Sequence, residues 1–439
     1  MKDVNSVAAR RLKAFFDSGT FVELGAYISR PGAVDTAEGV VCGYGAMNGR
    51  LVFAFAQDSS SMKGALDGRH ADKILRTYEK ALSVGAPVVG FFDCAGAVVF
   101  DGAAALAGYG KLLRTVSEAS GVIPQIAVIS GTCAGTMASV AALFDLTVTI
   151  DGVSRLYVSS PTQVGDTVGS AAYAYEQGNA ALLAKTEEEA MATVRTVLSY
   201  LPDHADHGIP ALESADDPAR IALNGRTSAK EAMSAAVDAG SLCELYGGYG
   251  APVTAGFATM GGMSCVALAL DGELNLAAIS KLTRLLSFAD TFGLPAVTFV
   301  NCVGVAADAA EEGALAQALA ALAAVMAEGT APRVTAIVGD AVGAGFIFGG
   351  SRALGADLVL ALPETEIAAL TARSAVAFLW NDRITPELSR EALEQEWRET
   401  KATPEAAAAD GEVDDIVAPA ELRARLIAAL YMLADKNVG

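Results

Sequence analysis

The sequence predicts an α/β protein built from two tandem copies of one unit, and three observations support this prediction. First, Asp17–Leu24 (DSGTFVEL) recurs as Asp238–Leu245 (DAGSLCEL). Second, a glycine-punctuated pair of apolar runs that begins at Val40 (VVCGYGAMNGRLVFAFAQD) recurs from Val253 (VTAGFATMGGMSCVALALD). Third, a chain of 439 residues, of which 52% are hydrophobic, is long and apolar enough to bury two cores.

The second part of each copy repeats at a constant spacing. The run GAPVVGFFDCAG at 85–96 recurs as GLPAVTFVNCVG at 293–304, 208 positions later. The same spacing pairs Gly135 with Gly343. Because four blocks recur in one order, chance is a poor explanation, and an internal duplication is the better one.

Each copy shows the same order of expected elements. The pattern predicts an opening helix, a pair of strands, a helix, a single strand, another helix, and a strand that ends in a turn of small residues. The single strand is expected at Val88–Phe92 in the first copy and at Ala296–Val300 in the second.

The copies are separated by residues 203–224, which contain prolines and acidic residues without hydrophobic periodicity. Such composition is typical of a linker. We therefore expect one domain at 1–202 and the other at 225–439. In the charged, Ala-rich tail, amphipathic patterns predict surface helices at 387–399 and 421–433.

The stretch GVIPQIAVISGTCAGTMASVAALFDLTVTI at 121–150 is the candidate catalytic segment. Residues 126–129 are typical of a buried strand, small residues at 131–135 interrupt the pattern, and an apolar run of helical length follows at 137–144. A strand, tight turn and helix together aim unpaired backbone N–H groups at a ligand. A buried turn without a ligand is the alternative. The recurrence of the pattern around Gly343 favours a site, with the turn glycine of each copy at a helix N-terminus.

Composition and motif counts argue against several classes of function. Thirty-one basic and fifty-one acidic residues give a formal net charge of −20, which speaks against nucleic acid or an anionic membrane as a partner. The start shows no apolar signal region, so we expect a cytoplasmic protein. Six cysteines form no C-x-x-C motif, and His204 and His207 lack a third ligand, so no metal is expected. Since His70 is the only other histidine, backbone amides are better candidates for catalysis than histidine acid–base chemistry.

A series of short motifs along nearly the whole chain resembles one enzyme family. The series includes Ala107–Gly110 (AGYG), Ala119–Gln125 (ASGVIPQ), Cys133–Gly135 (CAG), Leu198–Pro202 (LSYLP) and Pro363–Ala368 (PETEIA). It resembles the carboxyltransferase subunit of biotin-dependent acyl-CoA carboxylases and decarboxylases, of the propionyl-CoA carboxylase β-subunit type. The resemblance implies an enzyme whose halves each have the crotonase-like (ClpP/crotonase superfamily) spiral α/β fold, which hydrophobic periodicity alone does not predict.

The resemblance also implies the reaction, which moves CO2 between carboxybiotin and a short-chain acyl-CoA through two backbone oxyanion holes. The first half would face acyl-CoA, with the amides of Gly135 and Thr136 as donors. The second half would face biotin, with its donors in Gly343-Ala344-Gly345. The internal repeat favours Gly343 and Ala344, whereas the family motif favours Ala344 and Gly345. Further residues expected at the acyl-CoA and biotin sites are Ala95, Gly96, Ala97, Ala134, Gly304 and Ile347.

The same resemblance implies partners. No M-K-M biotinylation motif is present, so biotin would arrive on a separate biotin carboxyl carrier protein. A biotin carboxylase, or a membrane decarboxylase subunit, would complete the system, and this chain would form a homo-oligomer, either a dimer or a hexamer of dimeric units. In the family register, Ile347 lines the acyl pocket and favours acetyl- or propionyl-CoA.

Two other functions stay open, and two departures from the family pattern motivate one of them, the non-catalytic paralogue. The family arginine of D-S-G-G-A-R is replaced by Val98, and Thr136 stands where a second glycine is usual. The alternatives are the carboxyltransferase subunit of a sodium-pumping, biotin-dependent decarboxylase acting on methylmalonyl- or glutaconyl-CoA, and a non-catalytic paralogue.

Overall fold

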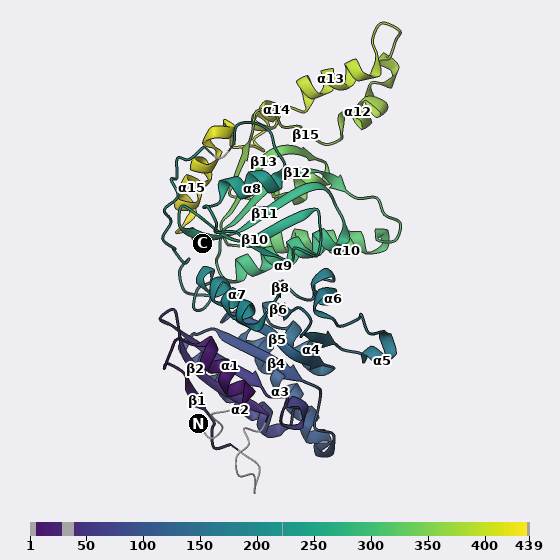
Figure 1. The fold of residues 1–439 in the computed structure, drawn as a ribbon. Helices are drawn as coiled ribbons and strands as arrows, with labels where there is room; N and C mark the ends of the chain where they lie inside the picture. Colours follow the sequence, from purple (N-terminus) through teal and green to yellow (C-terminus); the bar gives the residue numbers. More distant parts are fainter. Residues whose placement is uncertain (1–5, 29–38, 222, 437–439) are drawn as a thin grey trace. The chain divides into compact units, whose positions relative to one another are not determined.

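Each half of the chain folds around its own eight-stranded mixed β-sheet (Figure 1). The structure is a computed structural model and describes residues 6–28, 39–221 and 223–436. The chain divides into unit 1, residues 1–208, and unit 2, residues 209–439.

Within its described residues, unit 1 holds the first sheet and seven α-helices. Its strands are β1 (Val22–Leu24), β2 (Val40–Met47), β3 (Arg50–Gln57), β4 (Val88–Cys94), β5 (Gln125–Ala134), β6 (Leu146–Ile150), β7 (Arg155–Tyr157) and β8 (Leu182–Ala184). Its helices are α1 (Val7–Phe15), α2 (Gly68–Val84), α3 (Ala103–Ala119), α4 (Thr136–Ala142), α5 (Pro161–Val164), α6 (Ala171–Glu176) and α7 (Glu187–Tyr200). The strand order is β1-β2-β3-β4-β5-β6-β8, and β7 pairs with the far part of β5. The first three strands are antiparallel, and the remaining pairs are parallel.

Unit 2 repeats this arrangement. Its strands are β9 (Cys243–Leu245), β10 (Val253–Met260), β11 (Met263–Leu274), β12 (Ala296–Val305), β13 (Arg333–Val342), β14 (Leu358–Ala361), β15 (Ile367–Ala368) and β16 (Asp415–Ile416). Its helices are α8 (Ala229–Ala236), α9 (Leu276–Thr291), α10 (Glu312–Glu328), α11 (Ala344–Phe348), α12 (Ala372–Leu379), α13 (Arg390–Lys401), α14 (Pro404–Ala409) and α15 (Leu422–Leu433). The strand order β9-β10-β11-β12-β13-β14-β16, with β15 beside β13, matches unit 1 strand for strand. The prediction of two copies of one α/β unit is therefore confirmed.

Helices cover both faces of each sheet, and the apolar core lies between the layers. In unit 1, α2, α3 and α4 bury a cluster that includes Phe55, Phe92 and Phe144, whose rings meet edge to face at 5.3–6.4 Å between centroids. Such aromatic pairs add to the free energy of burial. In unit 2, α8 and α15 bury a second cluster against the sheet.

The repeated motif at Asp17 ties the opening helix of unit 1 to its last helix. The Asp17 carboxylate accepts a hydrogen bond from Arg195 Nη1 at 2.9 Å and another from the Gly49 N–H at 3.1 Å. Arg195, which lies on α7, also donates to the Phe15 carbonyl at the end of α1. A single arginine thus satisfies both a carboxylate and a helix-terminal carbonyl.

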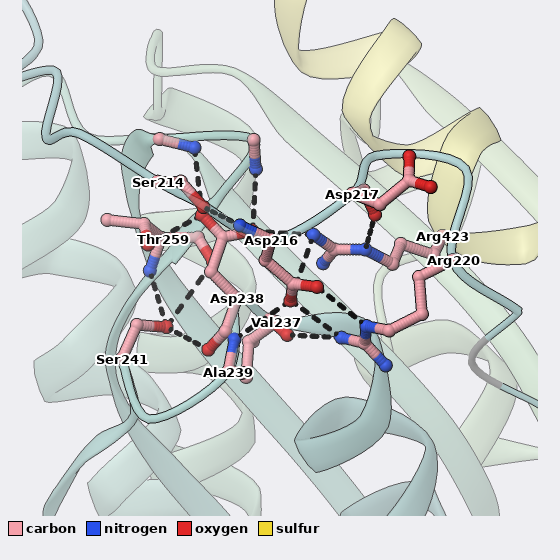
Figure 2. A network of polar contacts seen from close by, with 12 residues as sticks. Ser214, Asp216, Asp217, Arg220, Val237, Asp238, Ala239, Ser241, Thr259 and Arg423 are labelled. Carbon is pink, nitrogen blue, oxygen red and sulfur yellow. Dashed lines mark hydrogen bonds and ion pairs between the residues drawn. The ribbon is translucent and has the colours of Figure 1, made fainter.

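Unit 2 uses the same arrangement with a different arginine. The Asp238 carboxylate accepts from Arg423 Nη2 at 2.7 Å and from the N–H groups of Gly261 and Gly262 at 2.9 and 2.8 Å. Arg423, on α15, also donates to the Ala236 carbonyl, which ends α8. Figure 2 shows this network, which also includes the segment around Asp216.

One local prediction needs correction. The small residues after position 130 do not form a long turn, because β5 continues through Ala134 and only Gly135 turns. The amphipathic surface helix predicted at 421–433 is confirmed as α15: one face is buried, with Leu426 and Arg423 at an exposed fraction of 0%, and the other lies in solvent, with Met432 at 65%. The charge of Arg423 on the buried face is paired with Asp238 in the interior. None of the helices in the described ranges has the length and apolar character needed to cross a bilayer.

Candidate active site

The carboxyl ends of β4 and β5 bring the predicted residues of unit 1 to one edge of its sheet. The two strands are parallel neighbours, and Cys94 lies opposite Cys133. The loop Ala95–Ala97, which leaves β4, therefore lies beside the turn at Gly135, which leaves β5. Ligands of α/β sheets usually bind at this edge.

Unit 2 places its predicted residues in the same way. β12 and β13 are parallel neighbours with Cys302 opposite Ala341. Gly304 lies near the carboxyl end of β12, and Gly343 directly follows β13. Each unit thus presents one glycine turn at the carboxyl edge of its own sheet.

The two turn glycines adopt one unusual conformation. Gly135 has φ 61° and ψ −131°, and Gly343 has φ 55° and ψ −123°. A side chain at these positive φ values would be strained, whereas glycine adopts them freely. Each glycine caps the N-terminus of the following helix, α4 or α11. The predicted position of both glycines at a helix N-terminus is confirmed.

The glycine amides themselves are already occupied. The Gly135 N–H donates to the Tyr157 carbonyl of β7, and the Gly343 N–H donates to the Ala368 carbonyl of β15, both at 2.9 Å. Gly135 and Gly343 are therefore not free to donate to a ligand, and their predicted donor role needs correction. Their contribution is to the shape of the turn.

The free donors are the next two amides. The N–H groups of Thr136 and Met137 have no acceptor among the residues that the structure describes, and the same holds for Ala344 and Gly345. This is the expected state of the first turn of a helix. Of the two registers that the sequence left open in unit 2, the structure leaves Ala344 and Gly345 available.

In each unit, a polar side chain from the neighbouring strand accepts a hydrogen bond from the strand that leads into the turn. In unit 1, Asp93 Oδ1 accepts from the Thr132 N–H at 3.1 Å, and a Cβ on Gly131 would lie 2.2 Å from that oxygen. In unit 2, Asn301 Oδ1 accepts from the Asp340 N–H at 3.0 Å, and a Cβ on Gly339 would lie 2.2 Å from it. Glycine is thus required in both strands because a side chain oxygen occupies the space beside them.

This brace was missed in the sequence, although a signal was present. Asp93 and Asn301 lie at matching positions of the 208-residue repeat, directly before Cys94 and Cys302. A polar residue that recurs at the end of two buried strands is a candidate for a shared structural role.

The only histidine near this edge of unit 1 is neutral and enclosed. Gln57 Oε1 accepts from the Asp93 N–H at 3.0 Å, and Gln57 Nε2 lies 3.2 Å from His70 Nε2. Burial lowers the pKa of His70 to about 3, and its exposed fraction is 0%. His70 therefore stabilises the end of the strands and is not placed to exchange protons with a ligand.

The remaining predicted residues differ in exposure. Ala95 and Thr136 are exposed, Gly96 and Ala97 are half-buried, and Ala134 is buried. Ile347 on α11 is 46% exposed, so it is not a core residue of that helix.

Val98, which stands at the position of the family arginine, is 6% exposed and belongs to the core. Val98 therefore presents no polar group at the edge, and the site must act without that cation.

The chain matches known proteins over almost its whole length. The model of the carboxyl transferase domain family matches residues 2–438. The chain is 33% identical to the carboxyltransferase subunit of propionyl-CoA carboxylase from Haloferax mediterranei, with 98% of this chain and 90% of the relative covered. It is 32% identical to methylmalonyl-CoA decarboxylase subunit alpha from Veillonella parvula, with the same coverage of 98% and 90%.

A solved structure supports the fold assignment. Transcarboxylase 12S, in a structure with methylmalonyl-coenzyme A and methylmalonic acid bound, superposes with a TM-score of 0.91 at 28% identity, covering 99% of this chain and 91% of that one. This likeness confirms the predicted two-domain crotonase-like fold. The chain therefore belongs to the carboxyl transferase domain family, and it is an enzyme of the carboxyltransferase type.

Proposed function

We propose that the chain transfers a carboxyl group between carboxybiotin, carried on a separate protein, and a short-chain acyl-CoA. The observation that carries this proposal is the pair of unoccupied neighbouring amides in each unit, Thr136 with Met137 and Ala344 with Gly345. Carboxyl transfer to a thioester develops negative charge on two oxygens, one on the thioester and one on the biotin urea. Two sets of fixed N–H donors match that requirement.

We assign the acyl-CoA to unit 1 and the biotin to unit 2. In unit 1, the amides of Thr136 and Met137 would hold the thioester oxygen, and Ala95–Ala97 would border the acyl group. The donor set of unit 2 fits a urea carbonyl, because Ala344 and Gly345 offer two adjacent N–H groups. Gly345 lets α11 pack against β12, since a Cβ there would lie 2.2 Å from the Cys302 carbonyl oxygen. When bound, carboxybiotin would supply the carboxyl group and the base that the side chains of this edge lack. The protein's own task is to bind, to orient and to stabilise charge.

A decarboxylase is the second candidate, and the 32% identity to a methylmalonyl-CoA decarboxylase subunit supports it. This subunit would catalyse the same carboxyl transfer in the opposite direction, from the acyl-CoA to biotin. The decisive experiment incubates the purified chain with free biotin and a panel of malonyl-type CoA esters and follows loss of the carboxyl group. A chain that transfers from none of them would refute both candidates.

We also propose that the chain works as a homo-oligomer in which the first half of one protomer meets the second half of another. Phe100 in unit 1 is 100% exposed and Phe378 in unit 2 is 79% exposed in the isolated chain. Large apolar side chains in solvent are typical of surfaces that a partner covers.

We expect light scattering to give a mass that is a multiple of the 44.8 kDa protomer. Phe378→Glu should shift the population toward the monomer, because the carboxylate would have to be desolvated in the interface. An active wild-type monomer would contradict the proposed assembly.

The acyl preference should depend on Ile347, which lies on α11 and is 46% exposed. If it lines the acyl pocket, its branched apolar wall favours acetyl- and propionyl-CoA with overlapping efficiency, because one methylene changes binding by only about 1–3 kcal/mol. Ile347→Asp should then change the acetyl-to-propionyl ratio of kcat/KM. Met432→Asp, at an exposed position of α15, is the matched control. An unchanged ratio in folded Ile347→Asp would remove this residue from the pocket.

A further inference from the structure

One connection at the carboxyl edge differs between the two units. In both, it leads from the end of a strand to the residue that caps the next helix. In unit 1, residues 58–66 separate the end of β3 from Asp67, which caps α2. In unit 2, β11 runs to Leu274, directly before Asn275, which caps α9. Unit 1 thus carries an insertion at the edge where we place the acyl-CoA.

The inserted segment has a strained backbone. Met62 and Lys63 have φ values of 45° and 55°, and Gly64 follows at 65°. Two successive non-glycine residues in the left-handed region cost conformational free energy. Such strain persists where the surrounding structure enforces it, and it often marks functional sites.

The surrounding structure does enforce it. The Ala95 N–H donates to the Lys63 carbonyl at 3.1 Å, and the Leu66 N–H donates to the Gly96 carbonyl at 2.8 Å. A Cβ on Gly64 would lie 1.9 Å from the Asp93 carbonyl oxygen, so the turn packs directly against the end of β4. The segment is therefore fixed to the loop Ala95–Ala97.

Among the residues that the structure describes, no contact of the Lys63 side chain accounts for its presence. It is exposed, and it makes no ion pair or hydrogen bond with any residue in the described ranges. Glycine would adopt the same backbone without strain. A cation is thus held at a strained position in a chain whose net charge is −20.

We propose that Lys63 binds an anionic group of the acyl-CoA substrate and sets its affinity. This inference rests on the proposed function, because it takes the acyl-CoA to lie at Ala95–Ala97. Two groups supply that chemistry: the phosphates of coenzyme A and the carboxylate of a malonyl-type acyl group. The ammonium forms a charge-assisted contact with either one.

The test is calorimetric titration of the full chain with coenzyme A, acetyl-CoA, malonyl-CoA and S-acetylpantetheine, which lacks the phosphates. Lys63→Gly should raise the Kd of coenzyme A about tenfold and leave that of S-acetylpantetheine unchanged. Its Tm should rise, because the strain is removed. Lys63→Arg should bind like wild type, and so should Lys80→Ala, a control at an exposed lysine of α2.

The outcomes separate the two sources of the anion. Weaker binding of coenzyme A, acetyl-CoA and malonyl-CoA alike assigns the contact to the phosphates, and weaker binding of malonyl-CoA alone assigns it to the carboxylate. Wild-type affinities in Lys63→Gly, or an equal loss for S-acetylpantetheine, would overturn the role of Lys63 and leave the proposed function intact. A wild-type chain that binds none of the four compounds would overturn both.

Discussion

Replacing Thr136 with proline is expected to lower the kcat of carboxyl transfer by about 10²–10³-fold in a protein that remains folded. Thr136 is the first residue of α4, where the helix itself does not use the backbone N–H. Proline is tolerated at that position, and its only necessary loss is the donor that we assign to the thioester oxygen. Steady-state transfer assays with thermal unfolding of the same samples measure both quantities.

The preceding glycine makes this substitution feasible. A residue before proline prefers extended backbone, and Gly135 at φ 61° and ψ −131° is the mirror image of an extended conformation, which achiral glycine accepts equally. Ala344→Pro makes the same change at the first residue of α11 in unit 2. Thr136→Ala is the matched control, because it keeps the N–H and removes only an exposed side chain. A proline variant with wild-type kcat would exclude that amide from catalysis.

The sequence predicted the duplication and the position of both turn glycines, because these depend on local pattern and on spacing. Gly135 and Gly343 each follow an apolar strand and precede an apolar helix. The constant 208-residue spacing of the repeat was therefore enough to predict that both lie at a helix N-terminus. The repeat also predicts that the two sheets share one strand order, as they do, but it does not predict what that order is.

The occupancy of the amides could not be predicted in this way. It depends on β7 and β15, which are three and two residues long and pair with the far ends of β5 and β13. Strands this short carry almost no periodic signal. Their pairing nevertheless uses the N–H groups of Gly135 and Gly343 and moves the free donors one position along the chain.

The arginine partners were also hidden. Asp17 and Asp238 stand at matching positions of the repeat, but Arg195 and Arg423 do not share that spacing. Only the fold reveals that each guanidinium reaches the same two groups, the aspartate and the carbonyl two residues before it. The two units therefore form the same arginine–aspartate contact, although the arginines lie on helices, α7 and α15, that do not align in the repeat.

Arg423→Met is expected to destabilise the protein by about 3–5 kcal/mol. The Arg423 side chain is fully buried and pairs with Asp238 at 2.7 Å and with Asp216 at 3.3 Å. Removing it leaves the Asp238 carboxylate buried without its cation (Figure 2). It also leaves the Ala236 carbonyl without a donor. Denaturant unfolding measures the loss in the free energy of unfolding.

Arg425→Met on the same helix is the control, because Arg425 is 54% exposed and its ion pairs at 3.7–3.9 Å are worth at most about 1 kcal/mol.

The loss of stability in Arg423→Met should depend on pH, because it depends on the charge of the Asp238 carboxylate. Burial raises the pKa of Asp238, but the hydrogen bonds from Arg423, Thr259 and the two glycine amides outweigh burial and hold it at about 2, below the ordinary value of 3.8. A carboxylate with a lowered pKa stabilises the folded state fully above its unfolded pKa and loses that contribution as the pH falls through the folded value. The gap between wild type and Arg423→Met should therefore be constant above about pH 5 and should narrow between pH 4 and pH 2. A gap that stays constant to pH 2 would mean that the lost stability comes from packing of the arginine stem and not from its charge.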